Sequence, residues 1–254
     1  MFEVIILILA GFGAGVVTGL AGVSAVVIAA PLLIVFLEYP PYLAIGIALS
    51  IDVFSSFSAT LIFYKNQKIR IRPTMILLVS ALLAVLIGSC LSRGTPSDIL
   101  SLASGLGILL SGIFMILKKE KGLSLKEKFP FLKDHKIISL ILGGLFIGTI
   151  AGVFGAGGGL MILFVLVIIM DYKIHEAVGT SVFLMIFIAF LGGFAHYLNA
   201  PFSFSLLAFG ALGGILGAVI SSIFANSLSE GALNKILGTA IAVLGTLLVA
   251  KTLF

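Results

Sequence analysis

Long apolar stretches alternate with short polar ones along the whole chain. Most of these stretches approach or exceed the roughly 20 residues that a helix needs to cross a bilayer, and they lack the ten-residue alternation of membrane barrel strands. Because helices satisfy their own backbone groups in lipid, we predict an all-α polytopic membrane protein. The predicted segments are 3–20, 24–37, 41–64, 74–92, 98–117, 137–153, 158–170, 175–197, 204–224 and 231–250.

A run of glycines interrupts the apolar stretch that extends from Ile137 to Met170. Glycine costs about 1 kcal/mol relative to alanine inside a helix, so this run predicts a turn between two short helices. The second helix would present free N–H groups and the positive end of its dipole. Bare backbone in lipid must be buried in protein or line a wet cavity, and transporters hold anions at such broken helices. A binding site is therefore expected at Gly155, Gly157, Gly158 and Gly159.

The second half of the chain repeats the first. A shift of 133 residues aligns over fifty positions without a gap and places several glycines on glycines, for example Gly22 on Gly155. We interpret this as an internal duplication, with repeats at 1–117 and 137–254 and a basic linker at 118–136. The first two segments of each repeat are short and either cross the membrane or return to their own side. Both alternatives give an odd number of crossings, so two inverted five-segment repeats are expected.

Composition and charge agree with a membrane protein and predict its orientation. The chain is 61% hydrophobic and 10% charged, with a mean hydropathy of +1.32, which excludes an ordinary water-soluble domain. The net charge of +5 arises in short loops, 65–72 and 118–136, and does not indicate nucleic-acid binding. If both loops are cytoplasmic at the cell membrane, the inverted arrangement puts 13 of the 15 basic residues inside, as the positive-inside rule expects. If each glycine-broken pair of segments is counted as one span, 12 of the 15 basic residues lie on the cytoplasmic side, so the charge distribution favours the inverted arrangement only slightly.

The other glycines divide by their spacing. A four-residue spacing along one helix face predicts close helix packing in membranes, and it occurs at Gly11, Gly15, Gly19, Gly144, Gly148 and Gly152. Gly22 and Ser24 instead stand at the counterpart of the glycine-rich break. For these two residues we expect a turn or a cavity lining, with a tight helix crossing as the alternative.

Two hydroxyl residues, Thr180 and Ser181, follow Gly179 just inside segment 175–197. They are candidate substrate ligands, and the alternative is that their hydroxyls bond to the backbone of their own helix. Their counterparts in the first repeat are Ile47 and Ala48, which cannot bind a ligand through a polar side chain.

Asp52 lies near the middle of an apolar segment that also carries several serines. An ionisable group at that depth is a candidate functional residue, because inserting it costs roughly 3 kcal/mol even on mild scales. Proton coupling through Asp52 is one hypothesis. A structurally hydrogen-bonded or permanently protonated carboxyl is the other.

His196, near the end of its segment, could neutralise an anion or relay a proton, or could simply be a half-solvated histidine at the membrane interface. No Lys or Arg lies well within any predicted span. A bound anion would therefore be held by helix N-termini, hydroxyls and His196, which favours a small and weakly held substrate. The single cysteine, Cys90, offers no disulfide framework or cysteine metal site. We expect no cofactor, metal or enzymatic centre, because Asp52 and His196 come from different repeats.

The stretch GTIAGVFGAGGGL at 148–160, with AVGTS at 177–181, HYLN ending at Asn199 and two copies about 130 residues apart, resembles the sulfite exporter TauE/SafE family. The resemblance implies a membrane transporter that exports sulfite, sulfonates or related small organosulfur anions. The first repeat departs from the family pattern, since it has GVSAV at 22–26 where a second glycine run is usual. This leaves open a one-sided site or a substrate other than sulfite.

The expected function is export of a small sulfur-containing anion, such as sulfite, a sulfonate or an organosulfur carboxylate, by alternating access. The expected partners are that anion and the lipid bilayer. The alternative is a passive anion channel or a permease for another small solute. Saturation of flux and its dependence on a proton gradient would separate the two.

Overall fold

The computed structural model describes residues 1–117, 135–155, 158–225 and 230–253, the last range with side chains from 235 onward. The first repeat contains α1 (Phe2–Ala21), α2 (Val26–Phe36), α3 (Pro41–Lys65), the short 3-10 helix η1 (Arg72–Thr74), α4 (Met75–Arg93) and α5 (Ser97–Leu117). The second contains α7 (Lys136–Phe154), α8 (Gly158–Ile168), α9 (Ile174–Asn199), α10 (Phe204–Phe224) and α11 (Glu230–Leu253). All ten predicted segments are helices, and the predicted all-α polytopic fold is confirmed.

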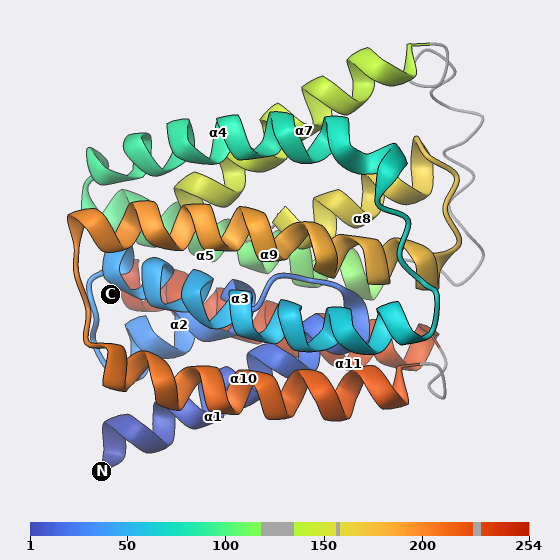
Figure 1. Ribbon diagram of the computed structural model, residues 1–254. Helices are drawn as coiled ribbons and strands as arrows, with labels where there is room; N and C mark the ends of the chain where they lie inside the picture. The colour runs from blue at the N-terminus through green and yellow to red at the C-terminus, as the bar shows by residue number, and fades with distance from the viewer. Residues whose placement is uncertain (118–134, 156–157, 226–229, 254) are drawn as a thin grey trace.

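Within the described residues, eight helices are long and apolar enough to span a membrane, whereas α2 and α8 have only 11 residues each. At 1.5 Å per residue, an 11-residue helix covers about 16 Å, roughly half of the 30 Å hydrocarbon core. The helices lie side by side (Figure 1). The two short ones therefore end inside the layer that the long ones cross.

The connections gather at two ends of the bundle (Figure 1). We call the end that holds both termini and residues 37–40, 94–96 and 200–203 the terminal end. The other, which holds residues 66–71 and 169–173, is the basic end. α3 runs from the terminal end to the basic end, and α9 runs the opposite way. The pair α1 and α2 starts and finishes at the terminal end, so this pair returns to its own side.

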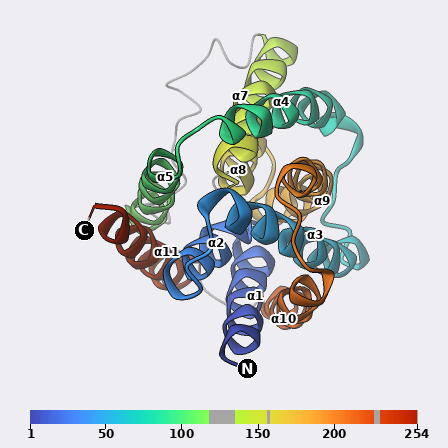
Figure 2. The same ribbon diagram turned by 90° about the vertical axis from the view of Figure 1, so that its left-hand side faces the viewer.

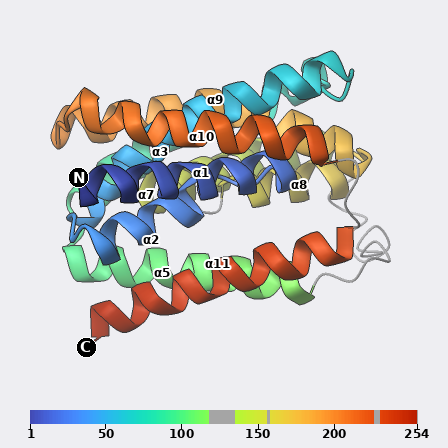
Figure 3. The same ribbon diagram turned by 90° about the horizontal axis from the view of Figure 1, so that it is seen from below.

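Helix pairing is the same for the two halves of the chain. The pairs with the most extensive contacts are α1 with α10, α4 with α7, α3 with α9, and α5 with α11. Replacing each helix by its counterpart in the other repeat exchanges the α1–α10 pair with the α4–α7 pair. The same replacement turns the α3–α9 and α5–α11 pairs into themselves, so the set of four pairs is unchanged. Viewed along the bundle, α3 and α9 lie between the α1–α10 pair and the α4–α7 pair (Figure 2). The α5–α11 pair forms a layer at one side (Figure 3).

The glycine spacing is confirmed as a helix-packing feature. A Cβ placed on Gly15 of α1 would lie 2.1 Å from the carbonyl oxygen of Gly214 on α10, and one on Gly148 of α7 would lie 2.1 Å from that of Ala81 on α4. Real Cβ atoms do not approach other atoms so closely, so these helices touch backbone to backbone. The same crowding occurs at Gly11, Gly19, Gly144 and Gly152.

The short helices lie in the interior of the protein. α2 is apolar on every face, and the residues from Val26 to Pro31 are all buried. In α8, the side chains of Ile162, Leu163 and Leu166 are likewise buried. A helix that is hydrophobic all round is typical of such a position. The interior ends of α2 and α8, at Val26 and Gly158, are therefore shielded from lipid, as broken helices in membranes require.

Candidate functional site

The first break comprises Gly22, Val23, Ser24 and Ala25, between α1 and α2. Gly22 has φ of 64°, in the left-handed region that glycine adopts most readily, and its N–H closes α1 on the carbonyl of Thr18 at 2.9 Å. The four residues are buried. The Ser24 hydroxyl accepts a hydrogen bond from the N–H of Val26 at 3.3 Å, so it satisfies one of the free donors at the start of α2. The predicted turn at Gly22 and Ser24 is confirmed.

The second break begins at Gly155, which follows α7. Gly155 also has φ of 64°, and its N–H bonds to the carbonyl of Ala151 at 2.9 Å. A Cβ at this position would lie 2.8 Å from Ile45 Cγ2 and 2.9 Å from Val26 Cγ1, so first-repeat helices pack directly on the turn. Helix α8 starts at Gly158. The predicted interruption of the helix is confirmed, and Gly157, a predicted site residue, lies outside the described residues.

The two breaks meet inside the bundle. A Cβ on Gly159 would lie 2.6 Å from the backbone N of Ser24 and 2.8 Å from the carbonyl oxygen of Gly22. The Ser24 hydroxyl lies 3.5 Å from the Gly155 carbonyl oxygen. The Ser181 hydroxyl lies 3.1 Å from the Gly22 carbonyl oxygen and 2.9 Å from the Val178 carbonyl oxygen, so it also bonds to the backbone of its own helix, as the alternative for this residue expected. Residues from both repeats therefore form one buried contact.

This contact brings together six of the predicted site residues, which come from both breaks, α8 and α9: Gly22, Ser24, Gly155, Gly158, Gly159 and Ser181. From it, α2 leads to the terminal end and α8 to the basic end (Figure 1). The N-termini of both short helices thus lie at the same depth in the bundle. The positive ends of two helix dipoles converge at this point.

Asp52 of α3 lies at the first break and is fully buried. Ser24 Oγ donates to Asp52 Oδ2 at 2.6 Å, and Ser56 Oγ, one turn along α3, donates to Oδ1 at 3.0 Å. The sequence singled out Asp52 but not its link to Ser24. The i, i+4 spacing of Asp52 and Ser56 could have predicted the hydrogen bond between these two side chains.

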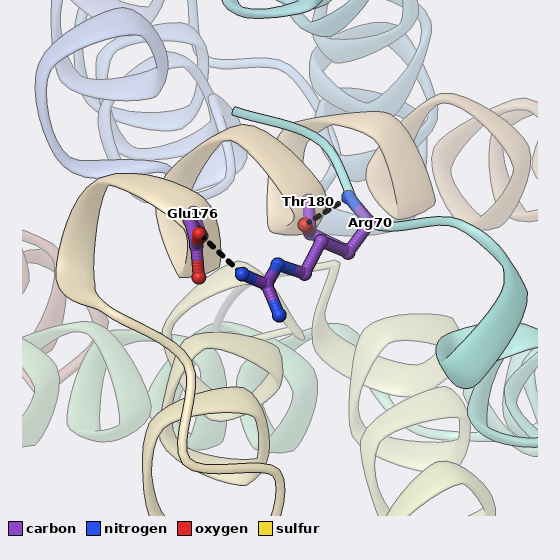
Figure 4. Close-up of polar contacts among 3 residues, drawn as sticks. All are labelled: Arg70, Glu176 and Thr180. Atoms are coloured by element: carbon purple, nitrogen blue, oxygen red, sulfur yellow. Dashed lines mark hydrogen bonds and ion pairs between the residues drawn. The ribbon is translucent and has the colours of Figure 1, made fainter. Parts of the chain in front are cut away.

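The Thr180 side chain points toward Arg70, in the loop after α3 (Figure 4). Its hydroxyl accepts a hydrogen bond from the N–H of Arg70 at 3.1 Å. The Arg70 guanidinium also pairs with Glu176 at 2.7 Å and lies 5.5 Å from the centre of the Tyr172 ring. Burial raises the pKa of the Tyr172 hydroxyl above that of a free tyrosine. These contacts join the first repeat to the start of α9 at the basic end, and sequence reasoning missed the role of Arg70.

His196 lies near the terminal end and is not among the residues that form the breaks. Its side chain is 1% exposed, so it is not half-solvated. It stacks on Tyr42 with 4.3 Å between ring centres, lies 3.3 Å from Ser92 Oγ, and bonds to the carbonyl of Gly192 at 2.9 Å. The predicted ligand His196 thus connects α3, α4 and α9 at the end opposite Arg70.

A cavity of about 450 Å³ lies between α3, α9 and the start of α10. Its lining is dominated by aromatic and aliphatic side chains, and the hydroxyl-bearing members are Ser50 and Tyr197. Ser50 donates its hydroxyl to the Gly46 carbonyl of its own helix at 2.9 Å. This cavity therefore suits an apolar group better than an anion. In the described part of the chain, no group of three or more His, Cys, Asp or Glu residues could hold a metal ion.

The fold is that of a multi-pass helical membrane protein, with two half-length helices that begin at a shared interior point. The chain belongs to the sulfite exporter TauE/SafE family, whose model matches residues 7–248, and it is a membrane transporter of that family. Similar proteins include two probable membrane transporters of Bacillus subtilis (strain 168). YunE is 24% identical over 240 residues, which cover 85% of this chain and 88% of YunE. YdhB is 24% identical over 245 residues, which cover 96% of this chain and 99% of YdhB. No solved structure matches the chain.

Proposed function

We propose that this transporter exports a small sulfur-containing anion, such as sulfite, a sulfonate or an organosulfur carboxylate, through a site at the meeting point of the two breaks. The observation that carries the proposal is the contact of Gly159 with Ser24 and Gly22, which brings the N-termini of two half-length helices together inside the bundle. Backbone N–H groups and helix dipoles at such termini attract anions. Broken helices that meet at mid-depth are the arrangement used by many transporters.

The proposed site residues are Gly22, Ser24, Gly155, Gly158, Gly159 and Ser181, with Gly157, Thr180 and His196 as further candidates from the sequence. Helices α1, α2, α8 and α10 contain no Lys or Arg. Attraction to a substrate would then rest on helix ends and hydroxyls, each contributing only about 1 kcal/mol or less. A singly charged or small anion that must be released quickly suits such a site better than a multiply charged one.

We infer further that the repeats are inverted copies and that transport proceeds by alternating access. The opposite directions of α3 and α9 (Figure 1) and the equivalence of helix pairs between the repeats support this. The Arg70–Glu176 pair and the Tyr42–His196 stack would close the two ends in turn. The basic end is proposed to face the cytoplasm, because loop 65–72 carries four basic residues.

Proton coupling is proposed to act through Asp52. Its carboxyl is fully buried, and its hydrogen-bond donors are neutral groups: the hydroxyls of Ser24 and Ser56 and the backbone N–H of Ala25. A buried acid in that setting can change its charge when its surroundings change during the transport cycle. In proteoliposomes, Asp52→Asn should make transport independent of an imposed proton gradient. Unchanged dependence on the gradient in that variant would dispose of the coupling proposal.

The test of the site is sulfite flux in proteoliposomes. A Cβ on Gly158 would lie 3.1 Å from Ala151 Cβ and 3.7 Å from Met185 Sδ, so the larger side chain of Gly158→Leu is expected to crowd the start of α8, where the anion is proposed to bind. The matched control is Gly107→Leu, because a Cβ on Gly107 of α5 meets no atom within 4 Å. Wild type and the control should show saturable flux, and Gly158→Leu should show none while remaining folded.

Normal flux in Gly158→Leu would contradict the proposed site. Flux that rises linearly with sulfite concentration and ignores the proton gradient would instead indicate the passive channel. Absence of sulfite flux in wild type, with saturable flux of a small sulfonate or an organosulfur carboxylate, would identify the substrate without changing the site.

A further inference from the structure

The two breaks differ in the polarity of the residues around them. Around the first break stand Ser24, Asp52 and Ser56, which are linked by hydrogen bonds. At a shift of 133 residues the corresponding positions in the second repeat are Gly157, Met185 and Ala189. All three polar side chains of the first repeat are thus replaced by residues without a polar side chain. The replacement is complete at these positions, although Gly22 and Gly155 both turn the chain with φ of 64°.

In the first repeat, the Asp52 carboxyl lies at the N-terminus of α2. It accepts the hydroxyl of Ser24 at 2.6 Å, and Ser24 in turn accepts the N–H of Val26 in the first turn of α2. The backbone N–H of Ala25 faces the same carboxyl. Asp52 comes from α3, so it approaches the start of α2 as a separate group, in the position where a bound anion would lie.

Within the part of the chain that the structure describes, no cation is recorded beside the Asp52 carboxyl. The ion pairs recorded among the described residues are Arg70 with Glu176 and Lys251 with Glu38, both at the ends of the bundle. Asp52 is 0% exposed, and a buried carboxylate needs compensating positive charge or donors. The positive end of the α2 dipole and the two serine hydroxyls are the groups that supply it.

In the second repeat, Met185 takes the corresponding place at α8. A Cβ on Gly158, the first residue of α8, would lie 3.7 Å from Met185 Sδ, and Met185 is 1% exposed. The thioether carries no charge and is only a weak acceptor. Among the described residues, therefore, the start of α8 has no side-chain anion where the start of α2 has one.

We propose that the Asp52 carboxylate is a tethered anion that occupies the N-terminus of α2, so that a substrate anion is accepted only at the start of α8, beside Gly158. The role of Asp52 at α2 stands by itself, whereas the placement of the substrate at α8 rests on the proposed function. Asp52 is then a positioning residue that makes the site one-sided, and Met185 is the residue whose neutrality leaves the other side open.

The first experiment tests the tethered anion without any transport. Asp52→Gly removes the carboxylate and leaves a space of its size beside Ser24. Formate, added to the purified protein, should raise the melting temperature of this variant well beyond its effect on wild type, because it binds only where the native site is empty. Ser56→Ala, which loses one hydrogen bond but keeps the carboxylate, is the matched control and should respond like wild type.

Asp52→Asn fills the same space without the charge and should also respond like wild type. If Asp52→Gly does not fold alone, purification in formate with recovery of the folded protein is the same positive result. A formate response equal to that of wild type, or failure to fold in formate as well as without it, would overturn the tethered anion.

The second experiment places a carboxylate at the start of α8. Met185→Asp should weaken sulfite binding at least about tenfold, because a fixed negative charge beside Gly158 repels the anion. Met185→Asn adds polarity without charge and should retain binding. The readout is the rise in melting temperature with sulfite, and equal rises in Met185→Asp and wild type would overturn the one-sided site.

The two experiments distinguish failure of the tethered anion from failure of the proposed substrate. Formate rescue of Asp52→Gly, together with no sulfite effect on wild type, would leave the tethered anion standing and remove the proposed substrate. Sulfite binding by wild type without formate rescue of Asp52→Gly would leave the proposed substrate standing and remove the tethered anion.

Discussion

The contact between the breaks predicts the effect of a single methyl group at Gly159. In Gly159→Ala the new Cβ would lie 2.6 Å from the Ser24 N, 2.8 Å from the Gly22 carbonyl oxygen and 3.0 Å from the Val23 carbonyl carbon. All three are backbone atoms, which cannot turn aside as a flexible side chain would. The two breaks must therefore separate before the methyl group fits.

The magnitude follows from two opposing effects. Overpacking of this kind costs about 1–3 kcal/mol, and replacing a helical glycine by alanine returns up to about 1 kcal/mol. In Gly107→Ala only the second effect operates, since no atom lies within 4 Å of the new Cβ. The free energy of unfolding of Gly159→Ala should thus lie about 1–3 kcal/mol below that of Gly107→Ala.

Unfolding in mixed micelles with a denaturant measures this difference, and sulfite flux in proteoliposomes measures its consequence. We expect Gly159→Ala to lose most of its flux, because separated breaks no longer form one site, and Gly107→Ala to keep it. Equal stability of the two variants, with normal flux in both, would refute the backbone contact between the breaks.

Three further predictions concern other contacts. A double-mutant cycle of Ser24→Ala and Asp52→Ala should give a coupling free energy of about 1.5–3 kcal/mol, as for a buried hydrogen bond to a charged group; additive effects would mean that the two side chains do not interact. Gly148→Ala should destabilise the α4–α7 pair by about 1–3 kcal/mol, and unchanged thermal unfolding would contradict the close approach. Arg70→Ala should lower the free energy of unfolding by less than about 1 kcal/mol, because an exposed ion pair contributes little; a far larger loss would show that the Glu176 contact is structural.

The helices and both breaks could be predicted from the sequence because their causes are local. Apolar stretches of membrane length predict helices, and glycines at Gly22 and Gly155 mark the turns because they adopt a positive φ without strain. The four-residue spacing that includes Gly15 and Gly148 gave the packing faces in the same way. Each of these features depends on neighbours within one or two helical turns.

Contacts between distant segments could not be predicted in this way. The partner of Asp52 is Ser24, 28 residues away, and the partner of Thr180 is Arg70 in the other repeat. A hydrophobic pattern indicates which positions are buried, but it does not say which polar groups meet there. The burial of His196 was missed for the same reason, because its shielding comes from Tyr42 and Ser92 on two other helices.

The central claim is that two broken helices meet inside the membrane and that a substrate anion binds where they meet. The most direct measurement is the melting temperature of the purified protein in increasing sulfite, with isethionate and chloride in parallel. A ligand of the native state at 100 times its Kd stabilises it by about 2.7 kcal/mol, so wild type and Gly107→Leu should melt at higher temperature with the transported anion, and Gly158→Leu should not. An identical rise in Gly158→Leu, or no rise with any small sulfur anion in wild type, would contradict the claim.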